Sequence, residues 1–475
     1  MRYRNWEIRD FSMGYIDKLD DNLLPESASS SCQNFISKQI GSLKKRDGQA
    51  RLKDGIVNMS QLTGPILGLY SYYYGNPLIE RELVFAANGV VYVWDGTDIS
   101  EINSDLDESQ PILFETCANY MVAFSGLDTP WKYDGTAVTT LSNAPVDGKM
   151  PVLHKEQLFV VPVSDPSALY WSEILDPEVW PVVNFWPIKE GDGDKITNLQ
   201  KFLGELIIFK GRSIHSLRGT SLSDFRLDEI DGAVGCVGPR AAAVHKHYIY
   251  FISDEGLMTF NGMKSTNLSQ EIMPVLWDTI NKEHLEKAVV GVWGGLVWFA
   301  LPEGTSTTNN LVLMFDPRDG SSGSFWPMRG INISCMAKFD DGKSTRLFTG
   351  DFGGYVNEQN IGNTDFGTPI NAFWVSKAFD FKVAASEKKA RKIFVEDSPN
   401  TTNVVTVEAS ADGGTFNGLT YRTADRKMRE YSFNSGVQWR RLKLKLIHAT
   451  TGGCEVRGII IPFRVKRRPR VKEAT

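Results

Sequence analysis

The sequence predicts an all-β protein: a six- or seven-bladed β-propeller with an extended N-terminal arm and a C-terminal antiparallel β-sandwich. Short alternating apolar runs bounded by Gly, Asn and Asp are typical of strands joined by tight turns. A pair of such strands recurs seven times at a spacing of roughly 40–50 residues, the period of a propeller blade. The helical signal is nearly confined to residues 269–288. A sandwich or a stack of hairpins is the alternative to the propeller.

The first segment, residues 1–60, does not fit the repeat. Residues 10–49 read as mostly extended, with a short helical turn expected at residues 27–34. We expect this segment to act as a clamp over the propeller or as an arm that reaches a neighbouring subunit.

The repeat occupies residues 61–362. Its first copy contains NGVVYVWDG at residues 88–96, a strand between two turns whose pairing partner is the strand before it. Asn-Gly and Asp-Gly supply the positive φ angles that two-residue hairpin turns require. The aromatic residue before each Asp-Gly or Asn-Gly is predicted to pack between adjacent blades. The other copies begin near residues 112, 151, 198, 241, 287 and 333.

The pattern changes again in residues 363–463, which alternate cleanly and predict the sandwich. The SADGGTF stretch at residues 410–416 is predicted to be a hairpin turn. Further along, alternation places Arg441, Lys443 and Lys445 on one face of a strand. Residues 464–475 form a separate basic tail.

Charge is unevenly distributed along the chain. From residue 377 onward there are 21 Lys and Arg against 10 Asp and Glu, a net charge of +11. The whole chain has a net charge of −5, so the preceding residues carry −16. An acidic body with a basic end predicts a directional interaction with a partner or with a second copy, although a set of solvated faces is the plainer interpretation of each single charge.

The basic tail supplies the only candidate contact residues. Such an arm binds phosphates in a salt-sensitive manner or pairs with an acidic protein surface, and the acidic body favours the protein surface. The candidates for partner or subunit contact are Arg464, Lys466, Arg467, Arg468, Arg470 and Lys472.

No motif predicts catalysis, a metal or a cofactor. His245 and His247 are two residues apart on a predicted strand, but no third ligand accompanies them, so a surface pair is favoured. GDGDK at residues 191–195 resembles part of a calcium loop without its length or closing Glu. Asp340 and Asp341 fit a turn. The aromatic residues of 171–186 could stack on a sugar, and inter-blade packing is the alternative.

The five cysteines are far apart and form no CxxC pair. They predict buried free thiols and a reducing compartment rather than disulfides or a zinc site. No apolar run approaches the roughly 18 residues that would span a bilayer, and the first residues do not resemble a signal peptide. We therefore expect no membrane insertion.

Several stretches, taken in order, resemble the tail-associated β-propeller proteins of phages. They are L-L-P-x-x-A, N-F and G-S-L-x-K-R-x-G within residues 23–48, ALYWSEILDPEVW at residues 168–180 and FLGELIIFKGRSIHSLRG at residues 202–219. The C-terminal hairpin followed by W-R-R-L-x-L-x-L is also similar. Within this group, the sequence most resembles the tail hub proteins of short-tailed phages, the packaged-DNA stabilization family. The nozzle proteins of related tails are also similar.

This resemblance implies a non-enzymatic structural protein of the virion tail, present in the host cytoplasm during assembly. It implies a ring, with a homohexamer expected, below the portal and its adaptor, or head-to-tail connector. Such a ring continues the DNA channel, retains the packaged DNA and anchors a needle, plug or fibres. Viral DNA would pass through without sequence-specific contacts, and an acidic wall would repel it.

Two other functional classes remain open. A carbohydrate-binding or glycosidase-type propeller would need acids or aromatic residues gathered at the propeller axis. A cytoplasmic scaffold propeller fits the composition equally well, and only the resemblance to the tail proteins argues against it.

Overall fold

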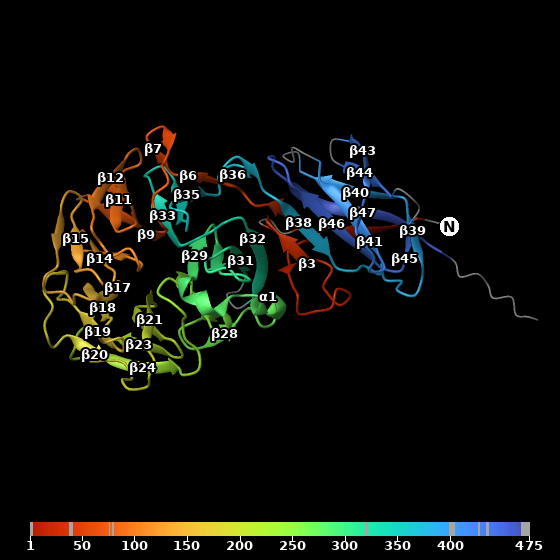
Figure 1. Cartoon of the computed structure of the whole chain (residues 1–475). Helices are drawn as coiled ribbons and strands as arrows, with labels where there is room; N and C mark the ends of the chain where they lie inside the picture. Colours follow the sequence, from red (N-terminus) through yellow and green to blue (C-terminus); the bar gives the residue numbers. More distant parts are fainter. Residues whose placement is uncertain are drawn as a thin grey trace, which may run out of the picture.

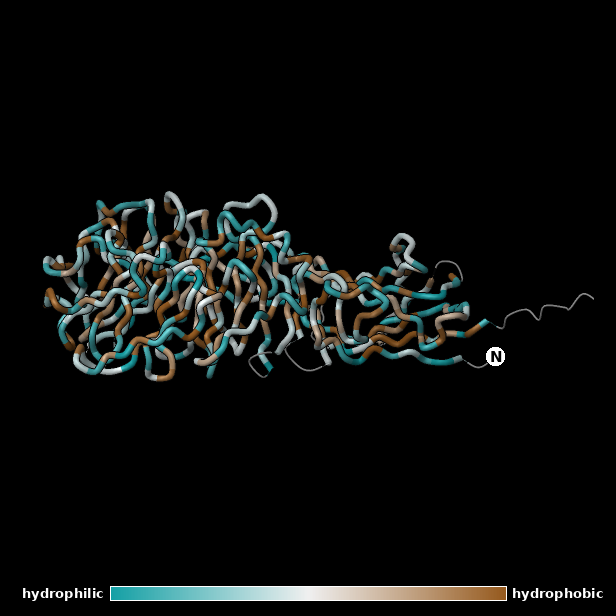
Figure 2. Tube along the Cα trace, turned by 90° about the horizontal axis from the view of Figure 1, so that it is seen from below, coloured by the Kyte–Doolittle hydropathy of each residue, from teal (hydrophilic) through white to brown (hydrophobic). Residues whose placement is uncertain are grey.

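The computed structural model describes residues 3–37, 41–75, 77, 80–318, 322–398, 404–425, 428–433 and 437–466. The molecule is elongated and all-β, with many small four-stranded sheets at one end and two larger sheets at the other (Figure 1). Figure 2 shows apolar stretches running through the inside of both parts, with hydrophilic stretches outside them.

Six of the small sheets are antiparallel and contain four strands that are consecutive in the chain. The first three sheets contain β9 (Ile66–Tyr74), β10 (Glu80–Ala87), β11 (Val90–Trp94) and β12 (Ile99–Asn103); β13 (Leu113–Cys117), β14 (Tyr120–Phe124), β15 (Trp131–Tyr133) and β16 (Val138–Thr140); and β17 (Gly148–His154), β18 (Gln157–Pro162), β19 (Ala168–Trp171) and β20 (Phe185–Pro187).

The next three sheets repeat this order. They contain β21 (Ile196–Phe202), β22 (Glu205–Lys210), β23 (Ile214–Arg218) and β24 (Arg226–Asp231); β25 (Ala242–His245), β26 (Tyr248–Ser253), β27 (Gly256–Phe260) and β28 (Ser265–Asn267); and β29 (Val289–Trp293), β30 (Leu296–Leu301), β31 (Leu311–Pro317) and β32 (Gly323–Arg329). The strand pair predicted around residues 82–94 is confirmed as β10 and β11.

The seventh sheet takes one strand from the N-terminal segment. It contains β33 (Cys335–Asp340), β34 (Thr345–Gly350), β35 (Val356–Gln359), β6 (Gln49–Arg51), β36 (Thr364–Asp365) and β37 (Thr368–Pro369). A separate hairpin of β7 (Lys53–Asp54) and β8 (Val57–Asn58) leads from β6 toward the first sheet. The first strand of each sheet contacts the first strand of the next, and β33 contacts β9, so the series is cyclic and propeller-like.

The aromatic residues that precede the Asp-Gly and Asn-Gly turns pack against a neighbouring sheet. The ring centroid of Trp94 in the first sheet lies 5.6 Å from that of Phe339 in the seventh. The ring centroid of Phe260 in the fifth sheet lies 6.4 Å from that of Phe202 in the fourth. The sequence prediction of inter-sheet packing is confirmed at these positions, and each contact hides a large apolar surface from water.

The turn residues themselves follow one scheme. The Oδ1 atom of Asp134 accepts hydrogen bonds from the backbone N–H groups of Thr136 and Ala137, both 2.8 Å long. Gly135, which lies between Asp134 and Thr136, has a φ of 96°, a conformation that favours glycine. Asp95 and Asn261 make the equivalent bonds in the first and fifth sheets. The recurring Asp-Gly or Asn-Gly is therefore a device that closes the outer hairpin of a sheet.

The two larger sheets lie beyond the sixth and seventh small sheets. The nine-stranded sheet contains β1 (Arg4–Ile8), β4 (Phe35–Ile36), β5 (Leu43–Lys45), β39 (Lys388–Ala390), β40 (Lys392–Asp397), β43 (Thr420–Asp425), β44 (Met428–Ser432), β45 (Gln438–Trp439) and β47 (Glu455–Val465). The six-stranded sheet contains β2 (Gly14–Tyr15), β3 (Ala28–Gln33), β38 (Ala372–Ser376), β41 (Thr406–Ala411), β42 (Asn417–Gly418) and β46 (Leu442–His448).

The N-terminal segment contributes strands to both larger sheets before it joins the small sheets. β1 pairs with β47, and β3 pairs with β38. The helical turn expected at residues 27–34 is wrong, because most of this stretch is strand β3. The Ser29 hydroxyl donates to the backbone carbonyl of Val375 over 2.9 Å, so pairing with the distant β38 replaces the local hydrogen bonds of a helix.

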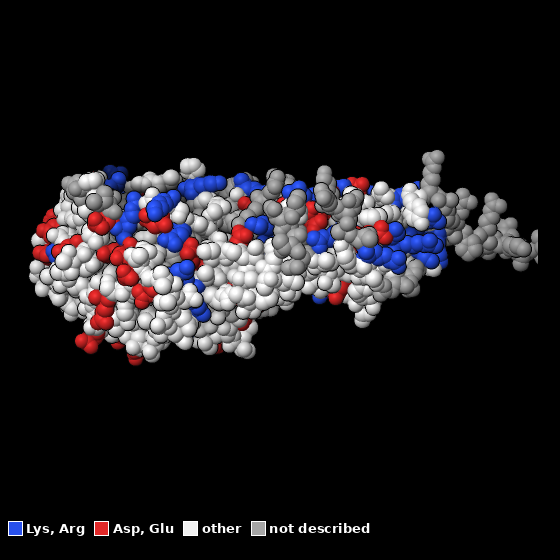
Figure 3. Space-filling model, turned by 90° about the horizontal axis from the view of Figure 1, so that it is seen from above, with Lys and Arg blue, Asp and Glu red and all other residues white. Residues whose placement is uncertain are grey.

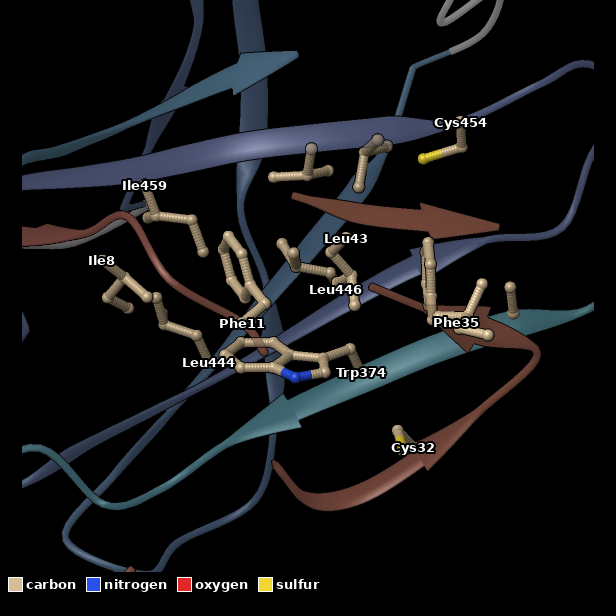
Figure 4. Close-up of a cluster of buried hydrophobic side chains, with 14 of the residues drawn as sticks. Ile8, Phe11, Cys32, Phe35, Leu43, Trp374, Leu444, Leu446, Cys454 and Ile459 are labelled. Atoms are coloured by element: carbon tan, nitrogen blue, oxygen red, sulfur yellow. The ribbon is translucent and has the colours of Figure 1, made fainter. Parts of the chain in front are cut away.

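One hydrophobic cluster fills the space between the two larger sheets, and Figure 4 shows part of it. The same cluster extends to the sixth small sheet. Trp374 is completely buried, and its ring meets Phe11 edge-on with centroids 5.1 Å apart. Trp326 of β32 belongs to the same cluster. The larger sheets and the ring of small sheets are therefore joined by a common core.

In the described parts of the chain, helix is found only within residues 269–288, where the sequence predicts it, and it connects the fifth and sixth small sheets. α1 (Pro274–Asp278) and the 3-10 helix η1 (Lys282–Lys287) lie between β28 and β29. Over the described parts of the chain, the structure contains no helix with the length and apolar character needed to cross a bilayer.

Candidate functional site

Basic side chains gather at the outer end of the larger sheets, along and beside β47 (Figure 3). Lys389 of β39 is paired in register with Arg464. Arg4 of β1 lies opposite Phe463, the neighbour of Arg464 in the chain. We call Arg4, Lys389, Arg464 and Lys466 the basic end. Three strands far apart in the sequence thus bring positive charge together.

Two of the six tail residues predicted to make contacts are described. The Arg464 guanidinium lies 3.8 Å from the centre of the Tyr3 ring, a cation–π contact. The backbone N–H of Lys466 donates to the carbonyl of Glu387 over 2.8 Å, and its ammonium contacts Gln438. These contacts fix where the chain leaves β47. The other four lie outside the described residues: Arg467, Arg468, Arg470 and Lys472.

The basic strand face predicted at residues 441–445 is partly neutralised. On β46, the Lys443 ammonium contacts the Asp21 carboxylate, and that of Lys445 lies 3.7 Å from Glu408. Arg441 is exposed, and its backbone N–H donates to Asp412 over 2.7 Å. The predicted alternation is confirmed, but two of its three charges have carboxylate neighbours.

Negative charge is concentrated at the opposite end of the molecule. Residues 61–232, which include strands β9 to β24, contain 25 Asp and Glu against 11 Lys and Arg, a net charge of −14. We call these first four sheets the acidic half; they lie away from the larger sheets (Figure 1). Several of the acids bind turn amides: N–H groups of Thr220 and Ser221 lower the pKa of the exposed Asp224 to about 2.

A buried polar cluster fastens the N-terminal segment to both parts of the molecule. The Nδ2 atom of Asn34 donates to the carbonyl of Asn371 over 2.8 Å. Its Oδ1 atom accepts from Nε of Arg46 and from the backbone N–H of Arg329, both over 3.0 Å. Asn34 is 2% exposed and has a φ of 58°, a conformation that Asn tolerates better than most residues. Sequence reasoning did not single out this role.

Arg46 extends the same cluster to the seventh sheet. Its Nη1 atom lies 2.9 Å from Oδ1 of Asp365 in β36, and its Nη2 atom also contacts that carboxylate. Nη2 donates to the carbonyl of Arg329 over 3.2 Å. The Arg46 side chain is only 3% exposed, so this two-pronged ion pair is shielded from water. We call Asn34, Arg46, Arg329 and Asp365 the junction cluster.

Residues 23–48 of the N-terminal segment therefore contribute to this junction. Leu24, Phe35 and Leu43 are each at most 1% exposed. A Cβ atom on Gly48 would lie 2.0 Å from the carbonyl oxygen of Thr364, so only glycine fits there. These residues have structural tasks within this chain.

The aromatic stretch at residues 171–186 is mostly engaged in packing. Trp171 is 1% exposed and meets Phe225 edge-on, with ring centroids 5.3 Å apart. The indole Nε1 of Trp180 donates to the Pro177 carbonyl over 2.7 Å. Phe185, at 46% exposed, is the aromatic residue of this stretch that most faces solvent. The packing interpretation is confirmed for Trp171.

The histidine pair is not on one strand. His245 ends β25, whereas His247 lies in the turn before β26, because the chain reverses between them. Within the described residues, no group of three His, Cys, Asp or Glu side chains is arranged to hold a metal ion. Burial lowers the pKa of both His154 and His448 to about 4.

The acidic motifs serve as structural ties. In GDGDK, both Asp192 oxygens lie 2.7 Å from the ammonium of Lys210, whose side chain is fully buried. Asp194 accepts backbone N–H groups at residues 195, 211 and 212. The Oδ1 atom of Asp341 accepts two turn amides, and that of Asp340 accepts one, as a turn requires. Residues 410–416 likewise form the predicted turn.

All five cysteines are buried and free, as the sequence predicts. Burial raises the pKa of the thiols of Cys32, Cys236 and Cys454 to about 12. These thiols remain protonated at neutral pH and are poor nucleophiles.

Comparisons with known proteins do not identify a family. No protein-family model matches the chain, and no curated protein matches it. Among solved structures it is similar to the crystal structure of the computationally designed Ika8 protein. The similarity has a TM-score of 0.41 and 14% identity, covering 66% of this chain and 99% of the designed one.

Proposed function

We propose that the chain is a seven-bladed β-propeller joined to an antiparallel β-sandwich, and that it is a structural protein of a phage tail hub or nozzle. Seven small sheets with cyclic contacts between their first strands support the propeller. Closure of the seventh sheet by the N-terminal β6 is the arrangement that seals a propeller ring. Two sheets around one apolar core support the sandwich.

The observation that carries the tail-hub proposal is the role of the motif residues. The stretch at residues 23–48 resembles phage tail propellers, and in this chain it forms the junction cluster between ring and larger sheets. A fastened junction suits a protein that transmits load between neighbours rather than one that moves around a substrate. Residues 23–48 carry both the resemblance to tail proteins and part of the junction cluster. The function expected from the family therefore concerns residues with a defined structural role in this chain.

In this proposal the protein works as a homohexameric ring below the portal and its adaptor. The ring continues the DNA channel, retains the packaged genome and anchors a needle, plug or fibres. It needs no cofactor and catalyses no reaction. It is present in the virion tail and, during assembly, in the host cytoplasm.

The charge distribution suggests how the ring is organised. The acidic half would line the channel, where like charges let DNA slide past without adhering. The basic end and its tail would contact an acidic surface on the next subunit or on the adaptor. A map of the assembled ring with a basic lumen would contradict this arrangement.

Deletion of residues 466–475 tests the role of the basic tail. We expect truncated chains to enter particles less efficiently, since five of the deleted residues are Lys or Arg. A chain with Lys189→Gln in the acidic half is a matched control for loss of one surface charge. Normal incorporation of the truncated chain would refute the role of the tail.

Two assays separate the tail protein from the sugar-binding alternative. Mass spectrometry of purified particles should find the chain at about six copies per portal ring, and a glycan array should give no specific binding. Absence from particles together with a glycan ligand would replace the tail hub by a carbohydrate-binding propeller.

A further inference from the structure

A cavity of about 200 Å³ lies at the centre of the ring of small sheets. Its walls come from the beginnings of the first strands of five sheets, β9, β13, β25, β29 and β33. Most of the lining residues have apolar side chains, including Leu67, Ile112, Val289 and Met336, and backbone polar groups also face the cavity. This volume is below the range of about 300–1,000 Å³ that holds drug-sized ligands, so the cavity suits a small molecule.

Arg240 is the one charged residue in this lining. It precedes β25 in the fifth sheet and reaches across to the first sheet, where its Nη1 atom donates to the Leu67 carbonyl over 3.2 Å. Its Nε atom is shielded from solvent and has no hydrogen-bond partner. A guanidinium has five N–H donors, so most of those of Arg240 remain available to a ligand.

No carboxylate of the described chain forms an ion pair with Arg240. Burial lowers the pKa of its guanidinium, although an arginine stays charged at neutral pH. Arg240 is partly exposed as a residue, but its Nε atom is shielded from solvent. A shielded charge without a counter-ion is costly, and proteins normally pair such charges or use them to bind ligands. Among the described residues, four other cations are buried. Arg46 and Lys210 pair with Asp365 and Asp192, whereas the ammonium groups of Lys45 and Lys388 donate to backbone carbonyls.

The position of Arg240 is fixed by its backbone. The Arg240 carbonyl accepts the N–H of Val290 over 2.8 Å, and the carbonyl of Gly238 accepts Nδ2 of Asn198 over 2.9 Å. A Cβ atom on Gly238 would lie 2.6 Å from the carbonyl oxygen of Glu286, so the loop passes close to η1. A guanidinium held in this way is preorganised for a ligand.

We propose that Arg240 binds a small free carboxylate in this central cavity. A planar carboxylate matches the two-pronged geometry of a guanidinium, and a short alkyl part would contact the apolar walls. The ligand supplies the negative charge that the lining lacks. The site is independent of the tail-hub proposal, because it depends only on the closed ring of small sheets.

The test uses the full chain with acetate and propionate as probes, and with chloride at equal ionic strength as the reference. Calorimetric titration should show saturable binding of propionate, and the melting temperature should rise with its concentration as binding to the folded state requires. Arg240→Met should abolish both effects while leaving the melting temperature in chloride unchanged or higher. Lys338→Gln, an exposed change on β33, should retain both effects.

Three results would overturn the proposal. Absence of saturable binding to the wild-type chain would do so whatever the variants show. Equal stabilisation of wild type and Arg240→Met by propionate would show that the effect does not involve the guanidinium. Equal stabilisation by chloride and propionate would mean that the cavity does not select a carboxylate.

Discussion

The ring of small sheets and the pair of larger sheets differ in how far apart in the sequence their paired strands lie. Six of the small sheets take four consecutive strands each, so their pairing is local. The larger sheets join strands from the two ends of the chain, as in the register of Arg4 with Phe463. Long-range pairing costs more loop entropy before it is rewarded. We therefore expect the larger sheets to form late and to depend strongly on their shared core.

Removing a large side chain from the shared core of the larger sheets should have the largest effect on stability. Trp374→Ala removes a completely buried ring from between the larger sheets, and should lower the free energy of unfolding by about 3–5 kcal/mol. Phe185→Ala, at a half-exposed position in the ring of small sheets, is the control and should cost about 1 kcal/mol or less. Urea unfolding measures both; equal losses would show that the two regions do not differ in this way.

The junction cluster tests whether the two regions are coupled. Arg46→Ala leaves Asp365 largely buried without its partner, and should lower the free energy of unfolding by about 3 kcal/mol. Lys44→Ala removes a partly exposed pair with Asp47 and should change the free energy of unfolding by less than about 1 kcal/mol. If proteolysis of the Arg46 variant releases no separate fragment and its stability is unchanged, the junction does not hold the regions together.

Acid should weaken both regions through one histidine in each. His154 lies in β17 and His448 in β46, and burial holds both pKa values near 4, below the ordinary value of about 6.5. The unfolded chain therefore binds more protons between these values, so stability present above pH 6.5 is lost as the pH falls toward 4. Each histidine should account for about 2 kcal/mol between pH 7 and pH 5.

Single replacements assign this loss to each region. His154→Gln and His448→Gln should each flatten the pH dependence of the melting temperature, whereas His247→Gln, at an exposed turn position, should leave it unchanged. A pH dependence that persists unchanged in both buried-site variants would contradict the assignment.

The smallest effect concerns the repeated turn of the ring. Asp134→Ala removes the acceptor for two turn amides and should cost about 1 kcal/mol, while Asp134→Asn keeps the acceptor and should cost less. Amide hydrogen exchange at residues 136 and 137 should quicken only in the Ala variant. Quickening in both variants would mean that charge, rather than the hydrogen-bond acceptor, holds the turn.

The ring was the more predictable region because its information is local. Trp94 with its Asp-Gly turn specifies a strand, a hairpin and a packing partner within a few residues. The larger sheets were predicted as strands, but their N-terminal members were not, because Ser29 meets Val375 only in the folded chain. For the same reason the sequence did not indicate the site residues: Asn34, Arg46 and Arg240 have roles that depend on partners at least 173 residues away.

For the basic tail, prediction from the sequence is limited in a different way. Its composition predicted a contact surface, and the structure adds Arg4 and Lys389 beside Arg464, which no alternation in the sequence indicates. The position of the acidic half opposite this end also required the fold (Figure 1). The charge counts predict an acidic part and a basic part of the chain, and the arrangement of the sheets places these two parts at opposite ends of the molecule.

Electron microscopy of phage particles labelled with an antibody against this chain tests the central claim most directly. We expect label at the neck or along the tail axis, in a ring below the portal. Label confined to peripheral fibres, or particles without label, would contradict a tail hub or nozzle.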